Sequence, residues 1–530
     1  MTTAEGVSAT VAVAAAGGQP RPDMSALAFR EGVRVTAEDD GVRVQSPWAA
    51  FVLGRLTDGT RAAVHRLAGE PVPPAVLLAG CTAAERTQVL RIVDRLGFLI
   101  TRSVLAQDRP LARIEATSRT ASYRPVSVPA QAPLRLSKFA LCRSYSGAFV
   151  LESPLTPHRV LLLDPASRAV VGALGDCVRA ADLVRAADLA PADVPAESVA
   201  ELLEHLAGAG FVDVGEWADG QARFAADEDE VLEQWDFHDL LFHSRSRAGR
   251  HDEPFGGIFP YEGRIEPRPA VEPAPAGPFI ELHRPALDDV LAADPALTTV
   301  LEGRTSVRQY GEEPMTVRQL GEFLYRTARV RSEYGPRPDQ KMPYEATSRP
   351  YPCGGAAYEL ELYLTVRRCE GLAEGVYHYD PVGHRLRLVN ENAGDRSAML
   401  YLASVATGGI AVPDVLVTMT SRFQRLSWKY RGIAYAVTLK HAGVLYQTMY
   451  LVATAMGLAP CGLGSGDADL AARVLGLDYL RESSVGEFML GSLPAAGRDG
   501  SAAAPPADWR AANDPQWTDA ARALLDRHDG

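Results

Sequence analysis

The sequence predicts an α+β protein in which two similar small modules precede a larger C-terminal domain. Three observations support this prediction. The same order of strands and helices occurs twice in the first half, a proline-rich stretch follows, and the rest of the chain combines alternating strands with a long apolar helix. The chain has 530 residues, of which 47% are hydrophobic. This length suggests about three domains, and the composition is sufficient for a core in each.

The repeated pattern defines two N-terminal modules, at residues 28–112 and 130–222. The first contains GVRVQSP and ends in RIVDRLGFLI, and the second contains GAFVLESP and ends in ELLEHLAGAGFVDV. The alternating segments are typical of strands. In each ending an amphipathic helix is followed by a glycine, Gly97 or Gly210, at the place where a helix C-cap favours glycine. Strands, helices and a final helix–glycine–strand unit predict two winged-helix modules.

Two segments outside the modules are expected to lack a core of their own. Residues 1–27 are rich in small residues, and no basic residue precedes their apolar run, so we expect a disordered tail and not a signal peptide. Residues 223–277 are predicted to be a linker or strap, because IEPRPAVEPAPAGP is proline-rich and therefore extended. His238 and His243 within it are five residues apart, which does not suit a metal site on a helix.

The third domain is predicted at residues 278–530. Thr316 and Gln319 form a capping box at the start of a helix. The segment YELELYLTVRR alternates as a strand, with Leu360, Leu362, Leu364 and Val366 on one side. GVYHYDPVGHRLRLV is typical of a hairpin, and a long buried helix is expected from about residue 438 to 456. Together these elements predict helices packed on an antiparallel-rich sheet.

Composition excludes several classes of protein. The net charge is −12, which argues against a general nucleic-acid-binding protein, because neutralising phosphates requires basic clusters. No apolar run reaches the length of about 20 residues that a membrane span requires. The six cysteines include no CxxC pair, so neither a zinc site nor a disulfide framework is predicted. We expect reduced cysteines and a cytoplasmic protein.

Three motifs are candidates for ligand binding. Arg304, Ser306 and Arg308 have an R-x-S-x-R spacing that can hold a phosphate group, although a solvated surface loop can have the same spacing. In RPYPCGG and in GLAPCGLGSGD, glycines would let the backbone approach a flat ligand closely. Neither motif contains the GK[ST] of a mononucleotide-binding P-loop.

Lys429 and Tyr430 lie side by side just before the long apolar helix. They can simply direct their polar ends into water, or they can form a proton-transfer pair. A tyrosine has a pKa of about 10 and is a poor base at neutral pH unless a nearby cation favours its phenolate. Lys429 can itself be the base if burial lowers its pKa. The sequence leaves the choice between the two residues open.

The C-terminal part of the chain resembles the nitroreductase-like flavoenzymes and, within them, the SagB-type azoline dehydrogenases, which oxidise thiazolines and oxazolines in ribosomal peptides. The resemblance rests on RTSVRQY, RPYPCGGAAYELELY, GVYHYDP, WKYRGIAY and HAGVLYQTMYLVATAMGL, in this order. The two N-terminal modules resemble the precursor-peptide recognition elements of peptide-modifying enzymes. In such an element a leader peptide adds as a strand to an exposed sheet edge.

The resemblance implies FMN as the cofactor and a role for each motif. Lys429 and Tyr430 would take part in removing the α-proton of the azoline ring. Cys353 stands where serine is more usual in the family. The implied FMN-binding residues are Arg304, Ser306, Arg308, Pro352, Cys353, Gly354, Gly355, Gly462, Gly464 and Arg498.

The resemblance also implies partners: a precursor peptide with leader and core, a second copy of the chain in a homodimer with FMN at its interface, and a cyclodehydratase. Molecular oxygen would reoxidise the flavin. Two other functions remain open, an NAD(P)H-dependent nitroreductase and a non-catalytic peptide-binding scaffold for a cyclodehydratase. For the modules alone, a structural or DNA-binding winged helix is the alternative.

Overall fold

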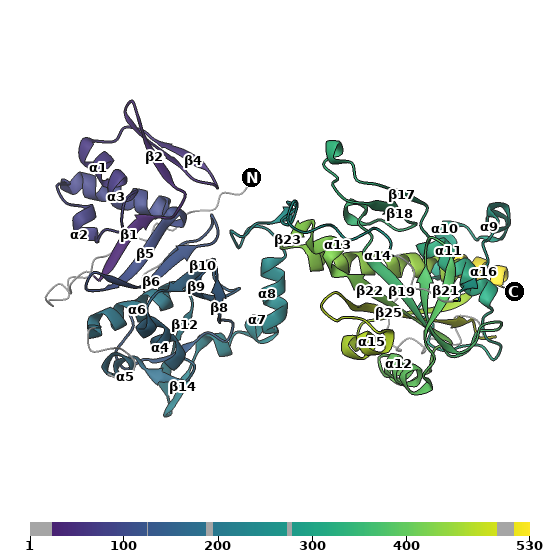
Figure 1. Ribbon diagram of the computed structural model, residues 1–530. Helices are drawn as coiled ribbons and strands as arrows, with labels where there is room; N and C mark the ends of the chain where they lie inside the picture. Colours follow the sequence, from purple (N-terminus) through teal and green to yellow (C-terminus); the bar gives the residue numbers. More distant parts are fainter. Residues whose placement is uncertain (1–23, 124–125, 187–193, 273–277, 496–513, 530) are drawn as a thin grey trace. The chain divides into compact units, whose positions relative to one another are not determined.

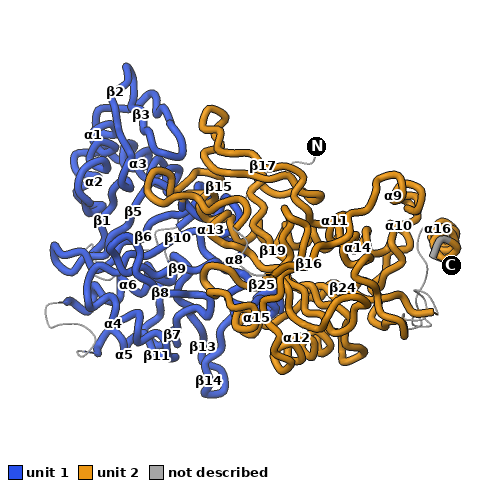
Figure 2. Tube along the Cα trace, turned by 45° about the vertical axis from the view of Figure 1, so that its right-hand side comes forward, with its two compact units in different colours: residues 1–253 blue, residues 254–530 orange. Residues whose placement is uncertain are grey.

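The computed structural model divides the chain into two compact units, residues 1–253 and 254–530 (Figure 1; the units are blue and orange in Figure 2). The boundary falls inside the predicted strap. The structure describes residues 24–123, 126–186, 194–272, 278–495 and 514–529.

Unit 1 contains the same order of elements twice, a meander of three strands followed by three helices. The first half consists of β1 (Ser25–Phe29), β2 (Arg34–Glu38), β3 (Gly41–Gln45), β4 (Ala50–Leu53), α1 (Asp58–Arg66), α2 (Pro74–Leu77), α3 (Ala83–Arg95), β5 (Ile100–Ala106) and β6 (Arg109–Ala116). The second consists of β7 (Pro133–Leu136), β8 (Leu141–Tyr145), β9 (Ala148–Glu152), β10 (His158–Leu162), α4 (Pro165–Ala173), β11 (Val178–Arg179), α5 (Ala180–Arg185), α6 (Ala196–Gly208) and β12 (Val212–Val214). The strands β13 (Glu216–Ala218) and β14 (Gln221–Arg223) and the helices α7 (Glu230–Glu233) and α8 (Phe237–Arg245) complete the unit.

The two halves share one sheet, so two separate winged-helix modules are not confirmed. Strand β10 pairs antiparallel with β6, with Val160 opposite Ile114, which creates a six-stranded sheet in the order β1-β5-β6-β10-β9-β8. Val104 and Leu111 from the first half belong to the hydrophobic core of the second. Strands β2, β3 and β4 form a sheet of their own. Alternating residues identify strands, but they do not determine which strands pair.

Two local predictions at the module ends need correction. Ser25–Leu27, predicted as part of the disordered tail, belong to β1, which pairs with β5; the preceding residues 1–23 lie outside the described part of the chain. Gly97 does not cap a helix, because α3 ends at Arg95 and Gly97 begins the 3₁₀ helix Gly97–Leu99. Gly210 does follow α6 with a φ of 81°, as the pattern predicts.

Two buried histidines make unit 1 sensitive to acid. His158 is 5% exposed and His205 is 8% exposed, and both rings pack against Tyr123. Burial, together with the positive charge of Arg102, lowers the pKa of each imidazole to about 4. Both histidines are therefore neutral in the folded unit across the physiological range.

Lowering the pH from 7 to 4.5 should destabilise unit 1. In this window the unfolded chain, with histidine pKa values near 6.5, takes up protons that the folded unit cannot bind until pH 4 is approached. The free energy of unfolding should fall by an amount on the order of 2 kcal/mol per histidine. Hydrogen exchange of α6 and β10, corrected for intrinsic rates, measures this loss. His205→Gln should reduce the pH dependence, and equal protection at both pH values would refute the assignment.

Unit 2 is built on a seven-stranded antiparallel sheet in the order β16-β21-β20-β19-β22-β25-β24. Its strands are β16 (Ile280–Glu281), β19 (Leu360–Val366), β20 (Gly375–Asp380), β21 (Arg385–Asn390), β22 (Val415–Arg422), β24 (Leu458–Leu463) and β25 (Glu482–Ser492). A separate ribbon is formed by β17 (Ser332–Tyr334) and β18 (Ala346–Ser348). The helices are α9 (Leu287–Ala293), α10 (Leu297–Gly303), α11 (Val317–Ala328), α12 (Ala393–Val405), α13 (Phe423–Ser427), α14 (Ala434–Ala455), α15 (Ala468–Leu475) and α16 (Pro515–Asp529).

Helices cover both faces of this sheet. Helices α11 and α14 lie on one face and α12 and α15 on the other (Figure 1). Leu362 and Leu364 of β19 pack on the first pair of helices, whereas Tyr363 packs on the second. The strand is therefore buried along its whole length. The predicted capping box of Thr316 and Gln319 is present at the start of α11.

Helix α14 is the predicted long apolar helix. It starts four residues before the predicted position and ends ahead of Gly457, which has a φ of 63°. The helix is not buried on all sides within one chain, because Tyr435 is 48% and Leu439 is 40% exposed on successive turns. The described residues include no helix with the length and apolarity to cross a membrane.

The second part of the predicted strap belongs to unit 2. The short strand β15 (Gly256–Gly257) pairs with β23 (Tyr430–Arg431). Buried Arg422 donates to the carbonyl oxygens of Pro269 at 3.0 Å and of Ala270 at 2.6 Å. The proline-rich chain is extended, as its composition indicates, but side chains distant in sequence bind its carbonyl groups. We refer to residues 254–272 as the strap.

Candidate active site

Lys429 lies against the loop that contains the Pro-Cys-Gly-Gly motif. Its Nζ donates to Tyr344 Oη at 2.5 Å, and Tyr344 Oη in turn donates to the carbonyl oxygen of Gly355 at 2.7 Å. Nζ also lies 4.8 Å from the centre of the Tyr344 ring and 5.1 Å from that of Tyr430. The ammonium group is thus held between two phenol rings, directly beside the glycine loop.

Tyr430 lies between the same loop and the strap. A Cβ atom at Gly354 would be 3.4 Å from Tyr430 Oη, and one at Gly257 would be 3.3 Å from the edge of the ring. Within the described residues, the Tyr430 hydroxyl has no hydrogen-bond partner. Its oxygen is therefore available to a bound ligand, unlike that of Tyr344.

Gly355 is needed for both its backbone conformation and the space beside it. Its φ is 63°, in the left-handed region that favours glycine, and a Cβ atom there would lie 1.8 Å from Lys429 Nζ. Any side chain at this position must displace the ammonium group.

Gly355→Ala should therefore move Lys429 out of its position and reduce turnover about 100-fold or more, as expected for loss of an acid–base group. Gly335→Ala is a matched control, because nothing lies within 4 Å of the added Cβ and its φ is not in the left-handed region. Steady-state turnover at equal protein concentration compares the two variants. If Gly355→Ala is as active as Gly335→Ala, the placement of Lys429 over the loop is wrong.

A buried pair, Glu359 and His441, anchors the glycine loop. The amide N–H of Gly354 donates to His441 Nε2 at 2.8 Å, so Nδ1 carries the proton and donates to Glu359 Oε1 at 2.8 Å. Glu359 is fully buried and His441 is 6% exposed. The pair therefore holds the Gly354 backbone against helix α14, on which His441 lies.

Cys353 is a thiol and not a reactive thiolate. Burial raises its pKa, and the neighbouring carboxylate of Glu359 raises it further. Its sulfur lies 3.6 Å from Glu359 Oε2 and accepts the Tyr358 N–H at 3.1 Å. Cys353, Glu359 and His441 have ligand atoms within 4.8 Å of one another, as a metal site would require. Here the groups already hydrogen-bond to each other and to the loop.

The R-x-S-x-R motif lies near the other end of α14, around Tyr450. Ser306 Oγ is 2.8 Å from Tyr450 Oη, which also accepts the Gly462 N–H at 2.7 Å, and the Arg304 guanidinium lies 5.3 Å from the Tyr450 ring centre. In the described part of the chain, no carboxylate lies within ion-pair distance of Arg304 or Arg308. Two half-buried arginines without an acidic partner suit a phosphate group.

A cavity of about 310 Å³ lies between the Leu439–Tyr446 part of α14 and the glycines that follow β24. Gly464 has open space where a Cβ would be, whereas a Cβ at Gly486 would lie within 2.4 Å of Tyr446 Oη. Burial raises the pKa of Glu487, which also lines the cavity. A wall of glycine backbone can accept a flat ring.

The predicted site residues form two groups within one chain. Lys429, Tyr430 and the Pro352–Gly355 loop lie near His441, whereas Arg304, Ser306 and Gly462 lie around Tyr450. His441 and Tyr450 are nine residues apart on α14, a rise of about 14 Å along the helix. Arg498 lies outside the described residues.

Four residues in these groups were not predicted from the sequence: Tyr344, Glu359, His441 and Tyr450. The sequence did contain a sign of His441 and Tyr450, since each places a polar group inside an apolar helix. No sequence pattern pointed to Tyr344 or Glu359. Tyr344 bonds to Lys429, 85 residues away in sequence, and Glu359 bonds to His441, 82 residues away.

Comparison with known families matches both units. Residues 301–492 match the nitroreductase family, and residues 134–252 match the cyanobactin oxidase ThcOx family. Residues 301–492 thus form a domain of the nitroreductase family, which supports an oxidoreductase. Together the matches support the resemblance to the SagB-type dehydrogenases that the sequence motifs predict.

Three curated proteins are similar to parts of the chain. The protein MJ1384 of Methanocaldococcus jannaschii, named as a nitroreductase, is 29% identical over 36% of this chain and 86% of its own length. The microcin B17-processing protein McbC of Escherichia coli is 32% identical over 21% of this chain and 42% of its own length. The trifolitoxin-processing protein TfxB of Rhizobium leguminosarum is 29% identical over 26% of this chain and 38% of its own length. The matched segments thus span less than half of the two peptide-processing relatives.

Solved structures give weak overall similarity. A nitroreductase-like protein of Ralstonia eutropha has a TM-score of 0.32 and 21% identity, and the match covers 45% of this chain and 97% of the other. The E. coli microcin synthetase complex McbBCD, with truncated pro-MccB17 bound, has a TM-score of 0.29 and 23% identity. The match covers 36% of this chain and 69% of the other.

Proposed function

We propose that the chain catalyses FMN-dependent oxidation of thiazolines and oxazolines to thiazoles and oxazoles in a ribosomally synthesised precursor peptide. The observation that supports this most directly is Lys429, held by Tyr344 over the Gly354–Gly355 loop with the Tyr430 hydroxyl unpartnered beside it. The proposal is consistent with the matched families and with relatives that process microcin B17 and trifolitoxin.

The residues present fit FMN. Arg304, Ser306 and Arg308 would hold its phosphate, and the backbone at Gly462 and Gly464 would accept the ring. The bound flavin would supply an acceptor for hydride from the β-carbon of the azoline ring. Pro352 to Gly355 would border the ring on the side where the peptide enters, with Cys353 contributing backbone and not thiol chemistry.

The chain's own contribution is to remove the α-proton. With Lys429 charged, its ammonium stabilises a phenolate at Tyr430, and the Tyr430 oxygen takes the proton. In the alternative, the Lys429 nitrogen takes the proton and Tyr430 orients the ring. Tyr344 acts in either case as a positioning residue, because its hydroxyl joins Nζ to the Gly355 carbonyl.

A homodimer would bring the two groups of site residues together. In a two-fold pairing along antiparallel α14 helices, the half of α14 near Lys429 in one chain faces the half near Arg304 in its partner. The exposed side chains of Tyr435 and Leu439 on α14 support such a contact, as do Leu287 at 71% and Leu291 at 69% exposure on α9. One flavin would then lie between residues of both chains.

The remaining partners belong to the same proposal. Unit 1 would bind the leader peptide through main-chain pairing at a sheet edge, and β4 is an edge strand of the β2-β3-β4 sheet. A cyclodehydratase would supply the azoline-bearing peptide, and molecular oxygen would reoxidise the flavin.

Mass spectrometry of an azoline-bearing precursor peptide, incubated in air with the FMN-loaded enzyme, tests the proposal. The expected result is the loss of two hydrogens per ring, with no need for NAD(P)H. An NAD(P)H-dependent nitroreductase would leave the ring mass unchanged and consume the nucleotide, and a scaffold would do neither.

A further inference from the structure

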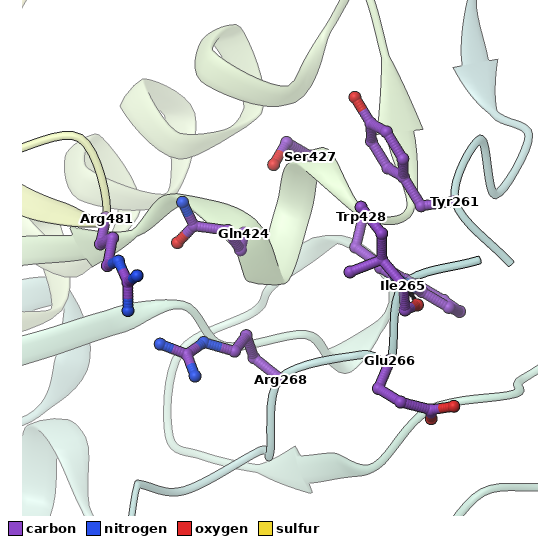
Figure 3. Close-up of a pocket in the computed structure, with 8 residues that line it drawn as sticks. All are labelled: Tyr261, Ile265, Glu266, Arg268, Gln424, Ser427, Trp428 and Arg481. Atoms are coloured by element: carbon purple, nitrogen blue, oxygen red, sulfur yellow. Dashed lines mark hydrogen bonds between the residues drawn. The ribbon is translucent and has the colours of Figure 1, made fainter.

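A second cavity of about 550 Å³ lies on unit 2 between the strap and helix α13 (Figure 3). Ile265 and Trp428 form an apolar wall, and Arg268, Gln424 and Arg481 form a polar one. These residues play no part in the two groups of site residues described above. We refer to this cavity as the strap pocket.

The backbone around the strap pocket is held in place by buried side chains. Trp428 Nε1 donates to the Ile265 carbonyl at 2.6 Å, and Arg425 Nη1 donates to the Arg268 carbonyl at 2.7 Å. Trp428 is 6% and Arg425 is 4% exposed. Arg268 therefore extends from a backbone that these hydrogen bonds hold in place.

The charge in the strap pocket is positive. The guanidinium groups of Arg268 and Arg481 both extend into the space below Gln424, whereas Glu266 directs its carboxylate away from them (Figure 3). No acidic partner of Arg268 exists in the part of the chain that the structure describes. Arg481 Nε is 3.4 Å from Asp478, but both side chains are more than half exposed, so this ion pair is weak.

The strap connects this pocket to the candidate catalytic residues. Trp428 directly precedes Lys429, and the Phe259 N–H on the strap donates to the Lys429 carbonyl at 3.1 Å. Arg431 Nη1 is 3.2 Å from Tyr261 Oη, again on the strap. An extended peptide advances about 3.3–3.6 Å per residue, so one that lies along the strap reaches both places within a few residues.

From this juxtaposition we infer that the strap pocket is a subsite for a carboxylate of the peptide substrate, close in sequence to the ring that is oxidised. The inference rests on the proposed function, since it concerns the peptide of that reaction. Two convergent guanidinium groups match the geometry of a carboxylate, and the Trp428–Ile265 wall accepts the aliphatic part of the residue that bears it. The carboxylate can belong to an acidic side chain or to the C-terminus of the peptide. The two have the same chemistry, and the test below distinguishes them.

The test uses three fluorescent peptides that carry one thiazole, the product ring, so that binding is measured without turnover. One has an aspartate beside the ring and an amidated C-terminus, one has asparagine and a free C-terminal carboxylate, and one has asparagine and an amide. By fluorescence anisotropy with the FMN-loaded full-length enzyme at low salt, one carboxylate peptide should bind about five- to tenfold more tightly than the neutral one. Tighter binding of the aspartate peptide would identify an acidic side chain as the ligand, and tighter binding of the free-acid peptide would identify a C-terminal carboxylate.

Variants of the two arginines assign this preference to the pocket. Arg268→Ala and Arg481→Ala should each weaken the preference, and Arg268→Lys should keep part of it. Arg331→Ala, at an exposed arginine beside the separate pocket at the β20–β21 turn, should leave it unchanged. Equal dissociation constants for all three peptides, absence of binding, or a preference that survives in the double variant Arg268→Ala/Arg481→Ala would overturn the inference.

The thiazoline forms of the same peptides separate this inference from the proposed function. Oxidation of all three without a difference in affinity would reject the subsite and leave the activity in place. A carboxylate preference that depends on Arg268 and Arg481, without oxidation of any thiazoline, would support the subsite and reject the activity.

Discussion

Tyr430→Phe and Lys429→Ala should each reduce oxidation of an azoline peptide by about 10²–10⁴-fold, the usual contribution of a general acid–base group. Tyr430→Phe keeps the ring that packs between Gly257 and Gly354 and removes only the hydroxyl. Neither residue is among those that we assign to the FMN phosphate. FMN content and peptide affinity should therefore stay close to the wild-type values while turnover falls.

The double variant of Lys429 and Tyr430 should be little worse than the more damaged single variant, because groups that act as a unit are not additive. Tyr344→Phe should give a smaller loss, with a shifted pH profile, since it removes the hydroxyl bonded to Lys429 Nζ. Tyr401→Phe, at a residue that is 66% exposed on α12, is the matched control. Near wild-type rates for both single variants would show that the pair is structural and that the base lies elsewhere.

Arg304→Ala should weaken FMN binding about ten- to a hundredfold, because a hydrogen bond to a charged group contributes about 1.5–3 kcal/mol. Arg304 is half-buried over Tyr450 and, among the described residues, has no acidic partner. Its removal therefore breaks no ion pair among the described residues and leaves a phosphate uncompensated. Quenching of FMN fluorescence during titration of the apoprotein gives the dissociation constant.

Arg331→Ala is again the control for Arg304. Among the described residues neither guanidinium group has an ion pair, and only Arg304 lies at the R-x-S-x-R motif. The thermal stability of the two apoproteins should be the same. Stoichiometric FMN after gel filtration of Arg304→Ala, with an unchanged dissociation constant, would mean that the phosphate lies elsewhere.

The sequence predicted those parts of the fold that depend on local patterns. The capping box at Thr316, the strand at Leu360–Val366 and the glycine after α14 are all determined by residues within one turn or one strand. The pairing of β6 with β10 was not predicted, because strand pairing is set by tertiary packing and not by alternation. The docked strap was not predicted either, since its contacts come from Arg422 and Arg425, more than 150 residues away.

The same distinction holds for the candidate site. Lys429 and Tyr430 are neighbours in sequence, and both pack against the glycine loop. A short motif was therefore enough to propose them. The loop's support, by contrast, requires Glu359 and His441 to meet across the interior. The distance between the loop and the R-x-S-x-R motif follows from the length of α14, and a linear sequence motif contains no information about it.

Anaerobic mixing of the FMN-loaded enzyme with one equivalent of a thiazoline peptide tests the central claim most directly, because it observes the proposed hydride acceptor and the product in the same sample. The account predicts loss of the oxidised-flavin absorbance together with a peptide that has lost two hydrogens, and return of the absorbance when air is admitted. It also predicts a much slower loss with Tyr430→Phe at equal FMN content. A flavin that stays oxidised with an intact thiazoline peptide, yet is reduced at once by NAD(P)H, would contradict it.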